Sequence, residues 1–168
     1  GLYCGAQVDF VDIDKKTFNI SMSELEKKLA QAKVENNIPK IIIPVHFAGQ
    51  SCDMKKLDSL RKEYGFKIIE DASHAIGGNY LDNKVGSCKY SDVTVFSFHP
   101  VKIITTAEGG LATTNNQEIA NRMRLLRAHG ITKDSALISN KDEGDWYYQQ
   151  VDLGYNYRMT DLQAALGI

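Results

Sequence analysis

The sequence predicts an α/β layer fold with a largely parallel β-sheet. Strand-like runs of β-branched residues alternate with amphipathic helical patterns along most of the chain. The helical segments between these runs are long enough to serve as crossover connections between parallel strands. The chain has 168 residues, of which 43% are hydrophobic and 24% are charged, a composition typical of one globular domain. We therefore expect a single core, built from a sheet that is covered by helices.

The first strand and the first helix are expected near the N-terminal end of the sequence. Residues 8–13 alternate between apolar and polar side chains, as strands with one buried face do. Ser21 and Glu24 form the S-x-x-E pattern of a capping box. Leu25 and Leu29 follow at helical spacing. The sequence thus predicts a strand over 8–13 and a helix that begins after Ser21.

A second strand and a second helix follow. Residues 40–46 form a short apolar run, rich in β-branched residues, which is typical of a parallel strand buried on both faces. Asp53 can cap a helix whose apolar positions include Leu57 and Leu60. Gly65 stands where a glycine commonly ends a helix. We therefore predict a strand over 40–46 and a helix between Asp53 and Gly65.

The centre of the chain contains three more predicted strands. Residues 66–71 and 93–98 are apolar runs, and a turn-rich stretch over 77–91 separates them. Residues 110–114 predict a shorter strand. The first of these strands ends in two carboxylates.

The last third of the chain is expected to be mostly helix and loop. Asn115 or Asn116 can cap a helix that closes at Gly130. Residues 131–150 are polar and carry no sustained periodicity, so we predict a mobile loop there. Residues 164–168 read as part of another helix.

Composition makes several classes of partner improbable. The formal net charge is -1, from 20 Lys and Arg against 21 Asp and Glu, and the basic residues are spread along the sequence. Nucleic acid and anionic membrane surfaces are therefore not expected as partners. No apolar run approaches the roughly 20 residues that a membrane-spanning helix needs. We expect a soluble protein without a membrane segment.

Cysteine and histidine spacing argues against a disulfide framework and a metal site. Cys4, Cys52 and Cys88 are odd in number and lie far apart, so a reducing cytoplasmic location is the default expectation. The four histidines show no close ligand spacing. No G-x-G-x-x-G or Walker sequence occurs, which makes a dinucleotide or P-loop site improbable.

Chemically active residues cluster where the predicted strands end. Segments 70–75 and 97–102 follow two strands directly, and segment 105–110 leads into a third. Ligands of open parallel sheets bind beyond the carboxyl ends of the strands. We therefore expect Asp71 and Lys102 to lie around one crevice. A lysine that is desolvated there is a nucleophile toward carbonyls, which is Schiff-base chemistry.

Simpler interpretations of these residues remain open at this point. Asp71 could only cap the turn after its strand, because Asp commonly begins turns. Lys102 could be a solvated loop lysine, because most lysines are exposed. A non-catalytic α/β binding module, in which Asp71 and Lys102 form an ion pair, is thus an alternative to an enzyme. His46 ends the predicted strand over 40–46 and is not counted among the expected site residues.

Six motifs in their order and spacing make the sequence similar to one family. They are E-D-A-S-H-A-I-G at 70–77, K-V-G at 84–86, S-D-V-T-V-F-S-F-H-P-V-K at 91–102, T-T-A-E-G-G at 105–110, R-x-H-G at 127–130 and G-Y-N-Y-R-M at 154–159. Together they resemble the DegT/DnrJ/EryC1/StrS family of pyridoxal-phosphate sugar aminotransferases. The S-H-A triplet and the S-F-H-x-x-K-x-I-T-T-A-E-G-G run most resemble its pseudaminic-acid pathway branch, which aminates C4 of a UDP-linked 4-keto-6-deoxy hexose.

The resemblance implies a fold and a domain boundary. Residues 1–168 correspond to the middle portion of the large, pyridoxal-phosphate-binding domain of a fold-type I aminotransferase, a three-layer α/β/α arrangement with a mostly parallel sheet. The N-terminal part of that domain and the small C-terminal domain are absent from this stretch. We therefore expect residues 1–168 alone to bind the cofactor weakly or not at all, because part of the phosphate cradle lies elsewhere.

The resemblance also assigns roles to single residues. Lys102 matches the lysine that forms the internal aldimine and then moves a proton between cofactor and substrate. Asp71 matches the carboxylate that keeps the pyridine nitrogen protonated. Ser97 matches a hydroxyl that binds the cofactor phosphate. His74 stands where many relatives carry glutamine, and it is expected against the cofactor ring or its phenolic oxygen.

The remaining implications concern partners. Asn156 and Arg158 match positions that reach across a dimer interface, toward the neighbouring subunit's cofactor phosphate and substrate. The resemblance thus implies a homodimer with shared sites, glutamate as the amino donor and a nucleotide-linked keto-sugar as the acceptor, as in UDP-4-keto-6-deoxy-N-acetylhexosamine. A sugar dehydratase is the alternative within the same fold. Lys102 argues against it, because family members with that activity replace the lysine by histidine.

Overall fold

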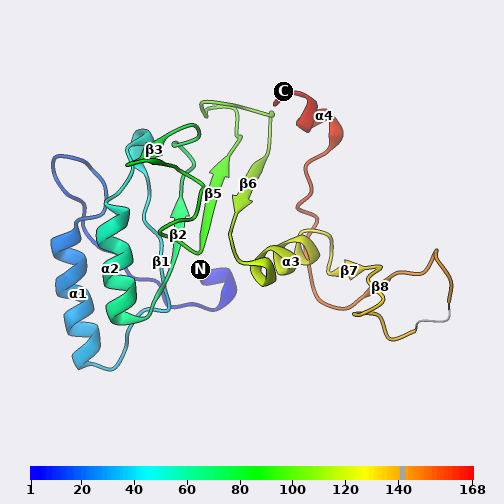
Figure 1. Cartoon of the computed structure of the whole chain (residues 1–168), viewed down its shortest axis with the longest axis horizontal. Helices are drawn as coiled ribbons and strands as arrows, with labels where there is room; N and C mark the ends of the chain where they lie inside the picture. Colours follow the sequence, from blue (N-terminus) through cyan, green and yellow to red (C-terminus); the bar gives the residue numbers. More distant parts are fainter. Residues whose placement is uncertain (141–142) are drawn as a thin grey trace.

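The core of the molecule is a four-stranded sheet, shown by a computed structural model that describes residues 1–140 and 143–168 (Figure 1). Its strands lie in the order β1 (Ile41–Ile42), β2 (Lys67–Asp71), β5 (Val93–Ser97) and β6 (Gly110–Thr113). Strands β1, β2 and β5 are parallel, and β6 pairs with β5 in the antiparallel direction. The predicted α/β fold with a mostly parallel sheet is confirmed.

Two helices cover one face of this sheet. Helix α1 (Met22–Val34) and helix α2 (Met54–Tyr64) lie side by side on the same side of the strands (Figure 1). Each fully buried aliphatic side chain contributes about 1.5–3 kcal/mol relative to an exposed one, so this helix-to-sheet contact is the main source of stability. The core side chains are Leu25, Leu29, Ile42, Cys52, Met54, Leu57, Leu60, Phe66 and Ile68.

The predicted start of α1 is confirmed, but its capping box is only half formed. Ser21 Oγ accepts a hydrogen bond from the Glu24 N–H at 3.3 Å. The Glu24 carboxylate does not return the bond, because it pairs with Lys27 Nζ at 2.7 Å. The Ser21 N–H donates instead to the Asp12 carbonyl at 2.9 Å. One orphan amide of the helix is therefore satisfied by the N-terminal segment.

Helix α2 has both predicted ends. Asp53 Oδ1 accepts from the Lys56 N–H at 3.1 Å, which caps the N-terminus. Gly65 adopts the left-handed conformation at φ 83 and donates its N–H to the Arg61 carbonyl at 2.8 Å. A residue with a Cβ would be strained at this φ.

The strand predicted over 8–13 is wrong. Its residues form no strand, and only Ile13 makes an isolated antiparallel bridge, to Ile20. Val8 is 49% exposed and Phe10 is 80% exposed. The alternating pattern supplies an apolar face, but among the described residues no strand lies beside this segment to accept its backbone hydrogen bonds.

The strand predicted over 40–46 is shorter, and the expectation that both of its faces are buried is wrong. Regular pairing covers only Ile41–Ile42, and a single bridge joins Val45 to Asp71. Pro44 has no N–H to donate to a ladder. On the face away from α1 and α2, Ile41, Ile43 and Val45 are 43–56% exposed. Within the described residues, helices therefore cover one face of this part of the sheet.

The turn-rich central stretch contains a small hairpin. Strands β3 (Asn79–Tyr80) and β4 (Asn83–Lys84) pair in the antiparallel direction. Two short 3₁₀ turns, η1 (Leu2–Cys4) and η2 (Phe47–Gly49), complete the N-terminal half.

The C-terminal third differs from its prediction at two points. Helix α3 (Gln117–Leu126) is capped by Asn116 and ends four residues before Gly130. Gly130 still binds the end of the helix, because its N–H donates to the Leu125 carbonyl at 3.0 Å, and a Cβ there would also clash with the Asp152 carbonyl. The predicted loop over 131–150 contains paired strands at its ends, β7 (Ile131–Thr132) and β8 (Gln149–Gln150). Residues 141–142 of that loop lie outside the described residues.

The last element is helix α4 (Asp161–Ala165), which confirms the helix expected at the C-terminal end. Thr160 and Gln163 form a complete capping box there. No helix among the described residues is long and apolar enough to cross a membrane.

Removal of one core side chain tests the helix-to-sheet contact. Leu57 is 0% exposed on α2, so Leu57→Ala leaves a cavity and should lower the free energy of unfolding by about 2–5 kcal/mol. Glu63→Ala, on the exposed side of the same helix, is the control and should change it by no more than about 0.5 kcal/mol. Urea unfolding of the full-length protein measures both, and equal losses would contradict this account of the core.

Candidate active site

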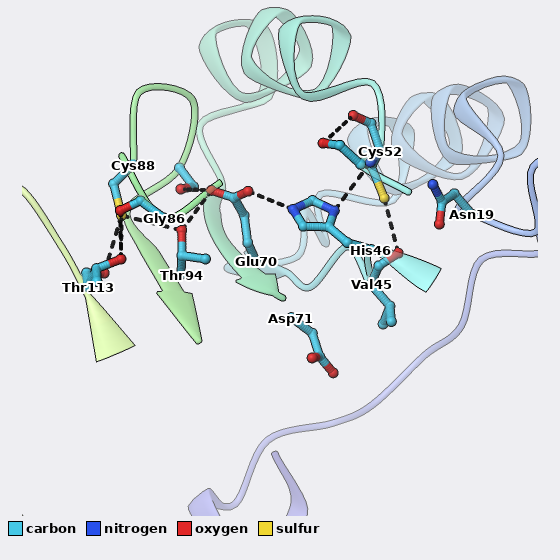
Figure 2. A network of polar contacts seen from close by, with 12 residues as sticks. Asn19, Val45, His46, Cys52, Glu70, Asp71, Gly86, Cys88, Thr94 and Thr113 are labelled. Atoms are coloured by element: carbon cyan, nitrogen blue, oxygen red, sulfur yellow. Dashed lines mark hydrogen bonds and ion pairs between the residues drawn. The ribbon is translucent and has the colours of Figure 1, made fainter. Parts of the chain in front are cut away.

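The register of β2 against β5 places two predicted site residues on one face of the sheet. Asp71 is paired with Val95, and Ser97 lies two residues farther along the same strand. Side chains alternate between faces along a strand, so Asp71 and Ser97 share the face that lies away from α1 and α2. Figure 2 shows Asp71 pointing away from the polar side chains beneath the sheet.

Two backbone hydrogen bonds join Asp71 to the segment after β1. Its N–H donates to the Pro44 carbonyl at 2.9 Å, and its carbonyl accepts from the His46 N–H at 3.0 Å. Its carboxylate Oδ1 accepts from the Ser73 N–H at 3.0 Å. Asp71 therefore does cap the turn after its strand. Its second oxygen has no hydrogen bond from the described residues and is available to a ligand.

Lys102 lies in the loop that leaves the same edge of the sheet. The loop begins after Ser97 at the carboxyl end of β5, and the Lys102 N–H donates to the His99 carbonyl at 2.9 Å. The Lys102 side chain is half-buried. Among the described residues no carboxylate is within ion-pair distance of its ammonium. The Asp71–Lys102 ion pair of the non-catalytic alternative is thus not formed.

The T-T-A-E-G-G motif closes this loop. The Phe98 N–H donates to the Gly109 carbonyl at 2.9 Å, and the Thr106 N–H donates to the Phe98 carbonyl at 3.0 Å. A Cβ on Gly109 would lie 2.3 Å from Thr106 Oγ1 and 2.7 Å from Met159 Cε. Glycine is therefore required where the lysine loop returns to the sheet.

Ser97 presents a hydroxyl at the same edge. Its Oγ accepts from the His99 N–H at 3.3 Å, and the hydroxyl hydrogen remains free to rotate toward a ligand. Ser97 is half-buried. A carboxylate, a hydroxyl and an amine are thus supplied by Asp71, Ser97 and the loop of Lys102.

His74 belongs to an aromatic cluster next to this edge. Its ring meets Phe47 edge-on at a centroid distance of 6.4 Å, and Phe47 contacts Phe18 at 6.2 Å. A Cβ on Gly49 would lie 2.9 Å from the His74 carbonyl oxygen, so the backbone segments after β1 and β2 touch. Phe47 was not predicted as a site residue, although an aromatic directly after a strand end could have signalled it.

Asn156 and Arg158 lie on the C-terminal segment. Asn156 pairs with Ala128 in an isolated antiparallel bridge. The side chains of Asn156 and Arg158 are both exposed. Met159, the next residue along the chain, lies against the lysine loop at Gly109. Among the described residues no hydrogen bond joins Asn156 or Arg158 to Asp71 or Lys102.

A buried polar network lies on the opposite, helix-facing side of β2 (Figure 2). His46 Nε2 and Glu70 Oε2 are 2.7 Å apart, and Glu70 Oε1 accepts from the Ser91 hydroxyl and from Thr94 Oγ1, the latter at 2.8 Å. Burial raises the pKa of Glu70, but the hydrogen bonds from His46, Ser91 and Thr94 outweigh it and hold the pKa below its ordinary value. Cys52 is buried nearby, and desolvation raises the pKa of its thiol to about 12.

The chemistry of the donor set fits pyridoxal phosphate. A carboxylate with a free oxygen suits a pyridinium N–H, a primary amine suits an aldehyde, and a hydroxyl donor suits a phosphate. Asp71 and Ser97 place a carboxylate and a hydroxyl on one face of the sheet, and Lys102 follows Ser97 by five residues in the loop after β5. His46 is fully buried on the other face and does not belong to this set.

Comparisons with known proteins identify the family of this chain. A 44% identical relative from Campylobacter jejuni subsp. jejuni serotype O:2 is a UDP-4-amino-4,6-dideoxy-N-acetyl-beta-L-altrosamine transaminase, and the match covers 99% of this chain and 40% of the relative. A GDP-perosamine synthase from Caulobacter vibrioides is 40% identical over 99% of this chain and 40% of its own length. The chain thus spans about 40% of the length of these relatives.

Solved structures give the same result. Helicobacter pylori PseC, an aminotransferase of pseudaminic acid biosynthesis, matches with a TM-score of 0.83 and 34% identity over 99% of this chain and 40% of that one. A putative sugar aminotransferase from Streptococcus pneumoniae in its pyridoxal-phosphate form matches with a TM-score of 0.77 and 32% identity, over 99% of this chain and 43% of that one. The model of the DegT/DnrJ/EryC1/StrS aminotransferase family covers residues 2–168. The chain therefore belongs to this family of pyridoxal-phosphate-dependent enzymes.

Proposed function

We propose that this chain carries the cofactor-binding lysine and carboxylate of a pyridoxal-phosphate-dependent sugar aminotransferase. One observation carries the proposal: Asp71 and Ser97 share a sheet face at the edge where the Lys102 loop leaves. Membership of the aminotransferase family supports it. A binding module of the kind considered above would pair Asp71 with Lys102, and among the described residues no such ion pair is formed.

The residues hold the cofactor by complementary chemistry. Asp71 would accept the pyridinium N–H through its free oxygen, and its negative charge would keep that nitrogen protonated. Ser97 would donate its hydroxyl to the phosphate, and Lys102 would bind the aldehyde carbon through Nζ. His74 would lie against the ring. When bound, pyridoxal phosphate acts as an electron sink for the carbon that loses a proton.

Lys102 serves in two ways in this proposal. Its amine holds the cofactor between turnovers, and it is released when the amino donor takes its place. The freed amine can then accept a proton from one carbon and return it to another. The loop closed by Gly109 keeps Lys102 close to the sheet edge during both steps.

The names of the relatives indicate which class of sugar the protein aminates. We infer a nucleotide-linked keto-sugar acceptor, UDP-4-keto-6-deoxy-N-acetylhexosamine, with glutamate as donor. The Campylobacter transaminase and the Helicobacter pseudaminic acid enzyme support this choice. The GDP-perosamine synthase, whose name specifies another nucleotide, makes GDP-sugars the substrates to compare.

We further propose that the working protein is a homodimer in which residues 1–168 are part of the large domain of each subunit. Asn156 and Arg158 are exposed and lie on a segment whose next residue, Met159, contacts the lysine loop at Gly109. Such side chains can serve the neighbouring subunit's site, Asn156 at the phosphate and Arg158 at the substrate.

Chemical trapping tests the role of Lys102. Borohydride should reduce the bond between Lys102 and the cofactor in the full-length protein, so that the tryptic peptide with Lys102 carries the added mass. Lys102→Ala should abolish this adduct and reduce kcat by about 10²–10⁴-fold, the range of a lost acid-base group. Lys84→Ala, an exposed lysine of the β3–β4 hairpin, should change neither. A colourless wild-type protein without any adduct would favour the binding module.

Isotope transfer tests the substrates. With ¹⁵N-glutamate as donor, the label should appear at C4 of the UDP-linked 4-keto-6-deoxy-N-acetylhexosamine, and NMR of the product identifies the carbon. Parallel reactions with GDP- and dTDP-linked keto-sugars should be slower in kcat/KM by at least about tenfold, the effect of one or two lost polar contacts. Equal rates would show that the nucleotide is not recognised as proposed.

Subunit mixing tests the shared site. If Arg158 serves the partner's site, co-expressed Lys102→Ala and Arg158→Ala subunits form heterodimers with one intact site each. Random pairing should then restore about a quarter of wild-type activity. A mixture of Lys102→Ala and Asp71→Asn subunits is the control. It should stay inactive, because each subunit supplies both of these residues to its own site. No recovery in the first mixture would place Arg158 in its own subunit's site, and an Arg158→Ala homodimer with wild-type activity would place it outside the site.

A further inference from the structure

The polar network runs across the strands on the helix-facing side of the sheet, opposite the Asp71 side chain. It links the end of β1 through His46 to Glu70 on β2 and to Thr94 on β5 (Figure 2). His46 and Thr94 are 0% exposed, and Glu70 is 5% exposed. Cys88 Sγ extends the network from Thr94 Oγ1, at 3.4 Å, toward β6.

The hydrogen bonds fix the protonation of His46. Its Nδ1 accepts from the Cys52 backbone N–H at 3.2 Å, and a peptide N–H can only donate. The ring proton therefore lies on Nε2, and His46 is a neutral donor to Glu70 at 2.7 Å. Glu70 is thus a buried carboxylate that is surrounded by three neutral donors, from His46, Ser91 and Thr94. Among the described residues no lysine or arginine is within ion-pair distance of it.

Stability alone does not account for this arrangement. Removing a carboxylate from water costs free energy even when neutral donors replace the water, and an apolar side chain would fill the space without that cost. The core around Ile68, two residues earlier on the same face of β2, is apolar. The charge at Glu70 therefore has a role other than filling the core.

His46 binds both the Glu70 side chain and the backbone of Asp71. The His46 ring contacts the Glu70 carboxylate, while the His46 N–H donates to the Asp71 carbonyl at 3.0 Å. Thr94, which donates to Glu70, precedes Val95, the register partner of Asp71. Glu70 thus connects the two strands that flank Asp71, β1 and β5.

We propose that Glu70 and His46 are positioning residues for Asp71, which they hold at the angle that meets the cofactor's pyridine nitrogen. The proposal rests on the proposed function of Asp71. Glu70 touches neither cofactor nor substrate, because it faces the helices. Its effect on cofactor affinity passes through the backbone of Asp71 alone.

A double-mutant cycle on cofactor binding tests this. Pyridoxal phosphate is titrated into the apo form of the full-length protein, for the wild type, Glu70→Gln, Asp71→Asn and the double variant. Glu70→Gln removes the charge and leaves one acceptor oxygen, which can accept either from His46 or from Ser91 and Thr94 but not from both sides. We expect Kd to rise about tenfold in Glu70→Gln, the effect of one lost hydrogen bond to a charged group. In the Asp71→Asn background the same change should alter Kd less than about twofold, because the two residues act as one unit.

Ile68→Val is the matched control, since Ile68 is 0% exposed on the same strand and face. It should lower the melting temperature of the apo protein while leaving Kd within about twofold of the wild type. If Glu70→Gln fails to fold, Ser91→Ala replaces it in the same cycle. This variant keeps the carboxylate and removes one donor, and it should raise Kd by a few-fold in the wild-type background only.

The outcomes separate this inference from the proposed function. If Glu70→Gln raised Kd equally in the wild type and in Asp71→Asn, or did not raise it in the wild type, the positioning role would be overturned. A wild-type protein that does not bind pyridoxal phosphate, or an Asp71→Asn variant that binds it unchanged, would overturn the proposed function instead.

Discussion

The pleat of strand β2 sends Glu70 and Asp71 to opposite faces of the sheet, and the candidate site depends on this alternation. Asp71 faces the edge where the lysine loop leaves, while Glu70 faces the helices and is held by hydrogen bonds. A shift of β2 by one residue against β5 would exchange the two carboxylates. The charge that now stands at the candidate cofactor site would then be buried under α2.

The register itself is fixed from the helix side. Ile68 and Phe66 belong to the core with Leu29 and Leu57, so β2 cannot slip without exposing them. The hydrogen bonds of Glu70 also favour this register, because only this register brings its carboxylate within 2.8 Å of Thr94 Oγ1. Apolar burial thus supplies most of the free energy, and the polar network makes one register the favoured one.

Much of this fold follows from local sequence patterns. The caps at Ser21, Asp53 and Gly65 act within one helical turn, so they could be predicted without knowledge of the tertiary structure. The segment over 8–13 could not, because a strand needs a neighbour and pattern alone does not supply one. Gly130 was predicted to close α3, and its N–H does bind the Leu125 carbonyl, but the helix itself ends at Leu126 and the close approach of Asp152 to Gly130 could not be predicted from local sequence.

The site was predictable to the same extent. The carboxyl ends of parallel strands lie at the same edge of a sheet, and this rule correctly placed Asp71 and Ser97 at one edge. The sequence did not decide which of Glu70 and Asp71 faces the core. The two preceding residues are Ile68 and Ile69, so the alternation of apolar and polar side chains is lost where it is needed. The contact between His46 and Glu70 could not be predicted for the same reason, because the sequence did not assign Glu70 to a face.

The surroundings of Asp71 decide how strongly its charge can act. Val45 and Val95, its neighbours on the adjacent strands, are apolar and 43% and 38% exposed. Two unit charges about 4 Å apart interact by about 1 kcal/mol in bulk water and about 4 kcal/mol near a protein surface. A ligand that covers these valines therefore strengthens its own interaction with Asp71, because it displaces the water that would weaken it. The two valines lower the polarity around Asp71 once a ligand fills the site. The Asp71 carboxylate is already fixed in place, so it does not have to reorient when the ligand binds.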